Sequence, residues 1–574
     1  MLIGWSSWSG GRPSAACPAN EALAIALLGR DGVGTVRPMR VRAGVLALAT
    51  AVAGLPLALP GTGTAAPVPV DRPSGQSRAS MPAPATRLLV LPARPADSLV
   101  DAYGVGIHTP FLDTPYADAG RVADALADLG VRHVRDDLFL RNPRQYKAIR
   151  TIAKRGIDFD LIMGRPDRPG TPADYVRTLA EELPKSAVEA VEGINEWDHF
   201  GRGRDWAREA AAWQRELYEK VKGTPATAHL PVLSPALAFS RNYLMLPDLS
   251  PWSDVANIHA YPGGEKPGTA LDTMVEALRA VLSPKPVVTT EAGYHNATRT
   301  TNGHRPTSER AAGLYLPRLL LEHVQRGQAR VYSYELIDEF RDAAKTNPEA
   351  NFGLLRRDWS PKPAYTAMKT MLGLLADPGP SFAPTPLDLG LSGWPLDGRY
   401  VVTQKRDGTY VVLMYRNDSV WDTSTRRDLA LDATNVRLDF PRSYGMTVHR
   451  LGESAQPVRR TKGTSITLPV DGAVTALTLD PRAGSTRPVT ARLKARPGHR
   501  SATVRWELAG ATKRVAAVRV KRSPGGVVRR LGPAVRRYRD TGLVNGRRYT
   551  YTVRVVTRSG PAPAPRSVTV VPGR

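Results

Sequence analysis

The chain has 574 residues, 42% of them hydrophobic, and a formal net charge of +26 at pH 7. This length excludes a single ordinary domain and predicts about three, with enough apolar residues to bury a core in each. From Pro481 onward, 23 Lys and Arg residues stand against two acidic ones. A basic binding surface is therefore expected in this tail and not in the nearly balanced remainder.

The first hundred residues predict export. Segment 39–66 has a basic start, an apolar stretch interrupted by two prolines, and small residues at its end, which is the pattern of a secretion signal. Cleavage there would remove the single cysteine, Cys17. The alternative is an uncleaved membrane anchor, for which the apolar stretch is of marginal length. Residues 1–38 are expected to be a non-native upstream extension with Met39 as the true start, and 67–97 to be a disordered Pro- and Ala-rich linker.

Between residues 98 and 378, apolar strand patterns alternate with amphipathic helical patterns. Eight strands are predicted, at Tyr103–Ile107, Val131–Arg135, Phe159–Met163, Val188–Ile194, Pro231–Ser234, Val255–His259, Pro286–Thr290 and Arg330–Glu335. Helical spacing is clearest at 119–130, 172–183, 206–223 and 271–282. Eight strand–helix units favour a (β/α)8 TIM barrel. The competing open doubly wound sheet would carry a Gly-rich phosphate turn after its first strand, and this sequence has none there.

Two all-β units are predicted after the barrel. Short alternating runs separated by Gly, Asp and Asn turns predict an antiparallel β-sandwich over 383–480. A second, strongly basic β unit is predicted over 486–572. The architecture expected from the sequence is therefore multidomain, with a barrel followed by two β-sandwiches.

Polar side chains end nearly every predicted barrel strand. They are His108, Arg135, Asn195 and Glu196, His259 and Tyr261, Glu291, and Tyr334 and Glu335. Because the carboxyl ends of barrel strands meet at one face, these groups are expected to gather there. Paired carboxylates such as Glu196 and Glu291 are what glycosidic bond cleavage needs. A lone glutamate after a strand is more often a solvated loop residue, so the interpretation depends on the joint pattern.

Three of these strand ends carry a more specific pattern. Asn-Glu closes strand four, His-x-Tyr closes strand six, and Thr-Glu-x-Gly closes strand seven. Together they resemble clan A of the glycoside hydrolases, the retaining (β/α)8 enzymes of the cellulase-like and β-xylosidase-like superfamily, over about residues 100–375. The segment FGLLRRDWSPKPAYTAMKTM also resembles the last barrel helix of those enzymes.

The resemblance implies roles for the strand-end residues. Glu196 would be the general acid/base and Glu291 the nucleophile of a double displacement. Asn195 would hydrogen-bond the sugar 2-hydroxyl. Arg135 and Tyr261 would hold Glu291 in place and keep it anionic. The alternatives are a salt bridge from Arg135 to Asp136 or Asp137, and a Tyr261 that packs the barrel rim with His259.

Other candidates keep two interpretations. His259 lines the same floor or packs the barrel rim, and His108 is a substrate contact or a structural hydrogen-bonding group. Trp197, with Trp206, His199 and Phe200, forms a sugar platform or covers a helix. Tyr334 and Glu335 stand where many clan members place a Trp. Either Glu335 and Asp338 would bind sugar hydroxyls, or Glu335 would be a rival carboxylate. No His/Cys cluster has metal-ligand spacing, so neither a metal nor a cofactor is expected.

The basic tail resembles a fibronectin type III domain, with Trp506 in an early strand and Leu543, Tyr549 and Tyr551 in the pattern GLVNGRRYTYTVRVV. Its charge suits an anionic cell-wall polymer or serves only solubility, and sequence-specific nucleic-acid recognition is not expected. The whole chain therefore predicts a secreted retaining β-glycoside hydrolase acting on a poly- or oligosaccharide, with no membrane attachment after cleavage. The alternative is a non-catalytic wall- or polysaccharide-binding protein on a glycosidase scaffold.

Overall fold

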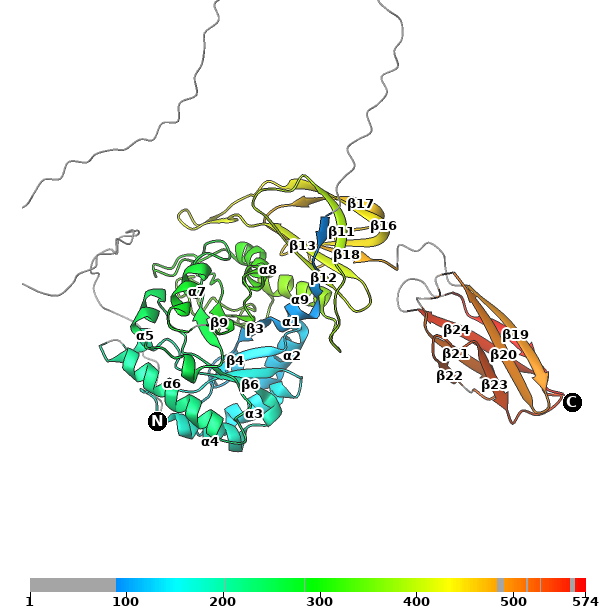
Figure 1. The fold of residues 1–574 in the computed structure, drawn as a ribbon, viewed down its shortest axis with the longest axis horizontal. Helices are drawn as coiled ribbons and strands as arrows, with labels where there is room; N and C mark the ends of the chain where they lie inside the picture. The colour runs from blue at the N-terminus through cyan, green and yellow to red at the C-terminus, as the bar shows by residue number, and fades with distance from the viewer. Residues whose placement is uncertain are drawn as a thin grey trace, which may run out of the picture. The chain divides into compact units, whose positions relative to one another are not determined.

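The computed structural model describes residues 89–573 except 202, 283, 483–489, 511, 513–514, 527 and 558–562. The predicted upstream extension, the secretion signal and most of the linker lie outside these residues. Figure 1 shows a barrel, a strongly bent sheet beside it and a C-terminal pair of sheets. Within the described ranges, no helix is long and apolar enough to cross a membrane.

Eight parallel strands form the barrel, and each matches a predicted strand. They are β3 (Tyr103–Gly106), β4 (His133–Asp137), β5 (Asp158–Ile162), β6 (Val188–Glu192), β7 (Val232–Leu233), β8 (Ala256–His259), β9 (Val287–Ala292) and β10 (Arg330–Ser333). Their order is β7-β6-β5-β4-β3-β10-β9-β8. A parallel bridge between Leu233 and Val255 joins β7 to β8 and closes the ring. The predicted (β/α)8 barrel is confirmed.

Helices surround this ring (Figure 1). They include α1 (Asp97–Asp101), α2 (Ala119–Leu129), α3 (Pro143–Ala153), α4 (Pro172–Glu182), α6 (Trp206–Gly223), α7 (Leu271–Arg279), α8 (Glu309–Gln325) and α9 (Pro363–Leu375). The sequence sets several helix starts, because the side chains of Asp118, Asn142 and Thr171 each accept a hydrogen bond from a first-turn backbone N–H. Gly130 ends α2 in the left-handed conformation that glycine tolerates best.

The middle β unit is one continuous bent sheet. Its strands are β1 (Leu89–Leu91), β2 (Arg94–Pro95), β11 (Leu387–Ser392), β12 (Gly398–Gln404), β13 (Tyr410–Arg416), β16 (Thr434–Leu451), β17 (Arg459–Val470) and β18 (Val474–Asp480). The bend lies in β16, whose register shifts between Asp439 and Tyr444. This corrects two expectations. The unit is not two separate sheets, and Leu89–Leu91 and Arg94–Pro95, expected in the linker, are strands of this sheet.

Strand β13 is buried on both faces, which explains its unbroken apolar run. Tyr410, Val412 and Met414 pack in the core of the bent sheet, and Val411, Leu413 and Tyr415 pack in the barrel core. Polar contacts reinforce this junction: the buried Arg318 of α8 donates to the backbone oxygens of Arg416 at 2.7 Å and Asp418 at 2.9 Å. The bent sheet is therefore an integral wall of the barrel unit. A short hairpin, β14 (Trp421–Asp422) and β15 (Arg427–Asp428), extends from it.

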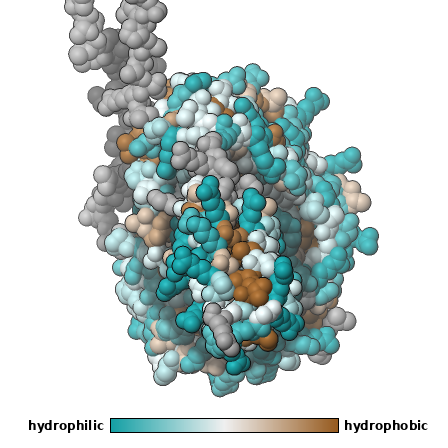
Figure 2. All heavy atoms as spheres, turned by 90° about the vertical axis from the view of Figure 1, so that its right-hand side faces the viewer, coloured by the Kyte–Doolittle hydropathy of each residue, from teal (hydrophilic) through white to brown (hydrophobic). Residues whose placement is uncertain are grey.

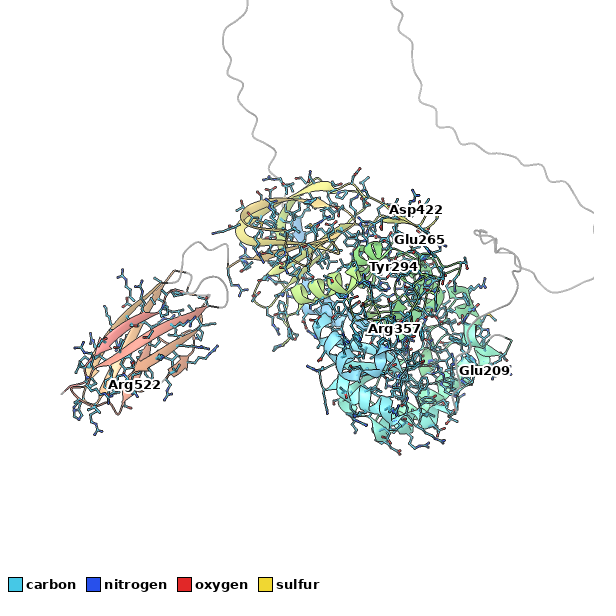
Figure 3. The ribbon with its side chains drawn as sticks, turned by 180° about the vertical axis from the view of Figure 1, so that it is seen from behind. Glu209, Glu265, Tyr294, Arg357, Asp422 and Arg522 are labelled. Carbon is cyan, nitrogen blue, oxygen red and sulfur yellow. The ribbon has the colours of Figure 1, made fainter. Side chains whose placement is uncertain are left out.

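The C-terminal domain consists of a three-stranded and a four-stranded antiparallel sheet. The first contains β19 (Thr490–Gly498), β20 (Ser501–Ala509) and β23 (Arg537–Thr541), and the second β22 (Val528–Leu531), β21 (Val515–Ser523), β24 (Tyr549–Thr557) and β25 (Arg566–Val570). Trp506 and Tyr551 are buried between them. Arg522 (Figure 3) pairs with the buried Asp540 at 3.1 Å. Hydrophilic side chains cover most of the surface seen in Figure 2. The fibronectin type III resemblance stays a prediction.

Candidate active site

Glu196 sits just beyond β6 in an unusual backbone conformation. Its φ of 46° lies in the left-handed region, where a residue other than glycine is strained. The Glu196 N–H donates to the Ala236 oxygen at 2.9 Å, and Asn195 forms a parallel bridge with Ala236. The chain after strand β7 therefore holds Glu196 at the start of the short helix α5 (Trp197–Phe200).

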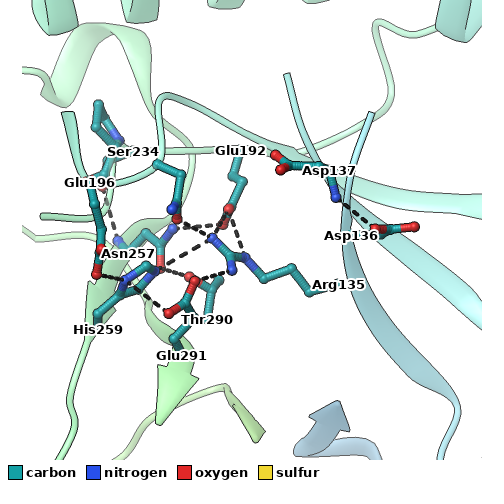
Figure 4. Close-up of polar contacts among 12 residues, drawn as sticks. Arg135, Asp136, Asp137, Glu192, Glu196, Ser234, Asn257, His259, Thr290 and Glu291 are labelled. Atoms are coloured by element: carbon teal, nitrogen blue, oxygen red, sulfur yellow. Dashed lines mark hydrogen bonds and ion pairs between the residues drawn. The ribbon is translucent and has the colours of Figure 1, made fainter. Parts of the chain in front are cut away.

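The two predicted carboxylates meet at one histidine (Figure 4). Nδ1 of His259 lies 2.8 Å from Oε1 of Glu196 and 3.5 Å from Oε2 of Glu291. One ligand atom from each of the three residues lies within 4.8 Å of the other two. Residues at the ends of β6, β8 and β9 thus converge, although they are far apart in the sequence.

Arg135 on β4 binds this group from the barrel interior. Its Nη1 donates to Oε1 of Glu291 at 2.5 Å and its Nε to Oε1 of Glu192 at 2.7 Å. Nη2 donates to Glu192 as well and to Oδ1 of Asn195 at 2.6 Å. Arg135 is buried together with both carboxylates. Such charge-assisted, forked hydrogen bonds are strong and directional, so the guanidinium fixes the orientation of Glu291.

Glu192 and Asn257 complete the network, and sequence reasoning missed both. Nδ2 of Asn257 donates to Oε2 of Glu192 at 2.8 Å, and the Thr290 hydroxyl donates to Oδ1 of Asn257 at 2.7 Å. The Asn257 N–H donates to the Ser234 hydroxyl at 3.0 Å. Their position in the sequence could have revealed them, because both lie inside mostly apolar strand runs. A buried polar group without a partner is costly there, so each predicts a buried hydrogen-bond network.

The surroundings of Glu291 favour its ionised form. Burial alone would raise its pKa, but His259, Arg135 and the Tyr261 hydroxyl together lower it well below the usual value. Tyr261 donates to Oε2 of Glu291 at 2.7 Å. For His259, burial would lower the pKa, and the two glutamates outweigh it and raise the pKa above its usual value. The site therefore combines the carboxylate of Glu291, whose anionic form is favoured, with the imidazole of His259, whose protonated form is favoured.

A second group borders the site at the ends of β3 and β10. Glu335 is fully buried and accepts a hydrogen bond from Tyr116 at 2.9 Å. Burial and the neighbouring Glu339 raise its pKa well above the usual value, which favours its neutral form. His108 lies 3.5 Å from Glu335, and burial lowers its pKa to about 4. A neutral Glu335 is a poor rival nucleophile.

Ring contacts join the His108 and Glu335 group to Tyr261, which binds Glu291. The ring centroid of Tyr334 lies 5.5 Å from that of His108 and 6.4 Å from that of Tyr261. The Tyr334 hydroxyl donates to Glu349 at 3.1 Å. His108, Glu335 and Glu339 also bring three possible metal-ligand atoms within 4.8 Å of one another. Sequence spacing could not reveal that cluster, because His108 lies more than 200 positions from the two glutamates.

Trp197 has two interpretations from the sequence, a sugar platform or a residue that covers a helix, and its burial favours the second. Its side chain is buried, with 1% exposed, and its Nε1 donates to Glu209 at 2.8 Å; Glu209 is labelled in Figure 3. Phe200 is 40% exposed, and the Arg165 guanidinium lies 4.3 Å from its ring centroid. Trp197 therefore supports the helix that carries Glu196 instead of presenting a face to a ligand.

Comparisons with known proteins agree with the fold. No family model matches the chain, and neither does any curated protein. Among solved structures, a glucosidase from Croceicoccus marinus aligns with a TM-score of 0.50 at 12% identity, covering 68% of this chain and 98% of its own. A monomeric beta-xylosidase from Caulobacter crescentus CB15 aligns at 0.48 and 14%, covering 68% and 98%. A family 39 glycoside hydrolase from Bacteroides cellulosilyticus WH2 aligns at 0.45 and 16%, covering 68% and 83%. At 12% identity, the likeness to the glucosidase shows a shared fold alone.

Proposed function

We propose that this protein is a retaining β-glycoside hydrolase that cleaves O-glycosidic bonds of a poly- or oligosaccharide. The observation that carries the proposal is the separation of the two carboxylates, with an oxygen of Glu196 and an oxygen of Glu291 within 4.8 Å. Retaining enzymes hold their pair about 5–5.5 Å apart, whereas inverting enzymes need roughly 6.5–9.5 Å to admit a water molecule. Direct attack by one carboxylate is the chemistry that fits this spacing.

In the first step, Glu196 gives its proton to the leaving oxygen as the bond from that oxygen to the anomeric carbon breaks. An oxygen of Glu291 forms the new bond to that carbon. In the second step, water gives a proton to Glu196 and bonds to the anomeric carbon while the Glu291 ester breaks. Arg135, His259 and Tyr261 favour the anionic form that Glu291 has before and after this cycle.

Asn195 is assigned to the sugar 2-hydroxyl. Its Oδ1 accepts from Arg135 at 2.6 Å, so its amide NH2 group remains as the donor for substrate. A donor fixed by a buried guanidinium costs little reorganisation when the hydrogen bond strengthens in the transition state. The solved glycosidases that share the fold support a carbohydrate as the substrate.

Substitution of the two carboxylates tests the proposal. Glu291→Gln and Glu196→Gln are compared with wild type on aryl β-glycosides and a polysaccharide panel, with Glu276→Gln, an exposed glutamate on α7, as the matched control. We expect both site variants to lose several orders of magnitude in kcat and the control to keep full activity. NMR of the first product formed should show the β-anomer. An α-anomer would exclude retention, and a wild-type protein that binds glycans without turnover would establish the non-catalytic alternative.

We also propose that the chain is exported and that its C-terminal domain is a fibronectin type III module holding the enzyme on an anionic cell-wall polymer. Supporting this type of module are the three-plus-four strand arrangement, the buried Trp506 and the Tyr549 hydroxyl, which accepts from the Val544 N–H at 3.1 Å. Loss of polymer binding after removal of the domain's charge, tested below, is the decisive experiment.

A further inference from the structure

One outer face of the C-terminal domain concentrates positive charge. Side chains alternate along the three-stranded sheet, so that Leu493 and Val504 point to the core and their neighbours point outward. The outward residues include six exposed cations, here called the cationic face: Arg492, Lys494, Arg496, Arg505, Arg537 and Arg539. Glu507 is the one acidic residue among the described positions of this face.

The strand register places like charges directly opposite one another. Lys494 pairs with Arg505, and Arg505 pairs with Arg537, which makes a row of three cations across three strands. Adjacent strands lie about 4.7–4.9 Å apart. Like charges directly opposite each other destabilise a sheet. This arrangement therefore costs stability unless something outside the domain neutralises it.

No partner within the described part of the chain neutralises the row. Lys494, Arg505 and Arg537 form no ion pair and no side-chain hydrogen bond there. The domain has two acidic residues: Asp540 is buried and paired with Arg522, and Glu507 faces Arg492 across the sheet. Since no described residue supplies it, the counter-charge of the row is left to solvent ions or to an anionic ligand.

We propose that the cationic face binds a linear polysaccharide that carries carboxylates. This inference deepens the proposed function, because it names the class of polymer on which the enzyme would be held. Arginine supplies five of the six cations, and its planar fork matches a carboxylate. Repeated charges along one chain would meet successive strands, and release of their counterions would favour binding.

The composition of the face argues against other ligands. The outward positions described on β19, β20 and β23 include no aromatic side chain, whereas proteins that bind single-stranded nucleic acid use aromatic rings on which bases stack. A neutral polysaccharide would find no ring to stack on and little but charge. An anionic saccharide suits the charge of the cationic face. It also suits the proposed glycosidase activity of the barrel.

The opposite sheet offers a matched control. Arg530, Arg519 and Arg554 form a similar row of three across β22, β21 and β24. Elsewhere this face carries Lys521 and two hydroxyl pairs, Thr550–Thr569 at 3.0 Å and Thr552–Ser567 at 2.9 Å. Replacing either row removes the same charge from the same cross-strand geometry, so the two variants differ in the face affected.

The test measures binding of the full chain to immobilised polygalacturonate over a range of salt concentrations. We compare wild type, the triple variant K494Q/R505Q/R537Q and the control triple R519Q/R530Q/R554Q. We expect the first triple to bind roughly tenfold or more weakly and with a shallower salt dependence, because fewer counterions are released. The control triple should stay within about threefold of wild type. Circular dichroism and thermal unfolding check that both variants are folded.

Three results would overturn the proposal. Equal weakening by both triples would mean diffuse attraction without a binding face. Tighter binding to polyphosphate or to duplex DNA than to polygalacturonate would reassign the ligand class. Unchanged binding by the first triple would remove the face from consideration. Turnover of a small aryl glycoside is measured in parallel, so failure of this proposal is separable from failure of the proposed hydrolase activity.

Discussion

Glu192 accepts hydrogen bonds from Nε and Nη2 of Arg135 and thereby turns Nη1 of the same guanidinium toward Glu291. The proposed nucleophile is thus held by a side chain that is itself held by a second carboxylate inside the barrel. Asn257 binds the other oxygen of Glu192. Orientation of Glu291 therefore depends on residues that the substrate does not reach.

This chain of contacts predicts the effect of Glu192→Gln. Loss of the Glu192 charge should loosen Arg135 and misplace Glu291, with kcat falling by roughly 100-fold and KM changing little. Steady-state kinetics on an aryl β-glycoside measure both constants. Glu192→Asp, which keeps the charge, should recover part of kcat. A rise in KM with unchanged kcat would contradict a positioning role.

Tyr261→Phe should change the pH profile. The Tyr261 hydroxyl helps to lower the pKa of Glu291, so its removal raises that pKa. Glu291 must be ionised to attack, and activity is lost as the pH falls through its pKa. The acidic limb of kcat/KM should therefore move to higher pH. Tyr334→Phe, which removes a hydroxyl bonded to Glu349 and not to Glu291, should leave that limb in place.

The contacts of His133, at the end of the barrel opposite the candidate active site, predict that the stability of the protein depends on pH. Burial would lower its pKa, but hydrogen bonds to Asp101 at 3.0 Å and Glu189 at 2.8 Å outweigh burial and raise it above 6.5. A histidine whose pKa is higher in the folded than in the unfolded state stabilises the folded protein. This contribution is complete at a pH below the unfolded pKa, and it is lost as the pH rises through the folded pKa.

His133→Asn should accordingly lower Tm more at about pH 5.5 than at about pH 9, since an unperturbed histidine titrates near 6.5. Thermal unfolding of wild type and variant across this range measures the difference. His229→Asn, at an exposed histidine with no side-chain hydrogen bond to the described residues, is the control for loss of an imidazole. A larger His133 effect at high pH would contradict the prediction.

Tyr415→Phe tests the junction between the barrel and the bent sheet. The Tyr415 hydroxyl donates to Oε1 of the buried Glu322 at 2.5 Å. Its removal leaves a buried carboxylate oxygen without that donor and should cost about 1–3 kcal/mol of unfolding free energy. Urea unfolding measures this cost. Tyr400→Phe, on an exposed ring of β12, should change the free energy by less than about 0.5 kcal/mol. Equal losses would show that the junction contributes nothing specific.

Much of the barrel could be predicted from local pattern. Mostly apolar runs marked the eight strands, because strands covered on both faces show little of the polar alternation of a half-exposed strand. Amphipathic spacing marked α2, α4, α6 and α7. Glu196 and Glu291 were candidates because they follow such runs. By contrast, the two-residue β2 and the three-residue β1 are too short to show a period, and they lay in what composition described as linker.

What the sequence determined by itself is the order of strands and helices and the residues at their ends, since these depend on neighbours within a few positions. Only the tertiary structure decided which polar groups meet. Closing the ring brought Glu192 against Arg135 and Asn257 against Glu192, and it placed His108 beside Glu335. Such pairings join residues dozens to hundreds of positions apart, and no local pattern encodes them, because their free energy comes from burial and hydrogen bonds that exist only once the barrel has closed.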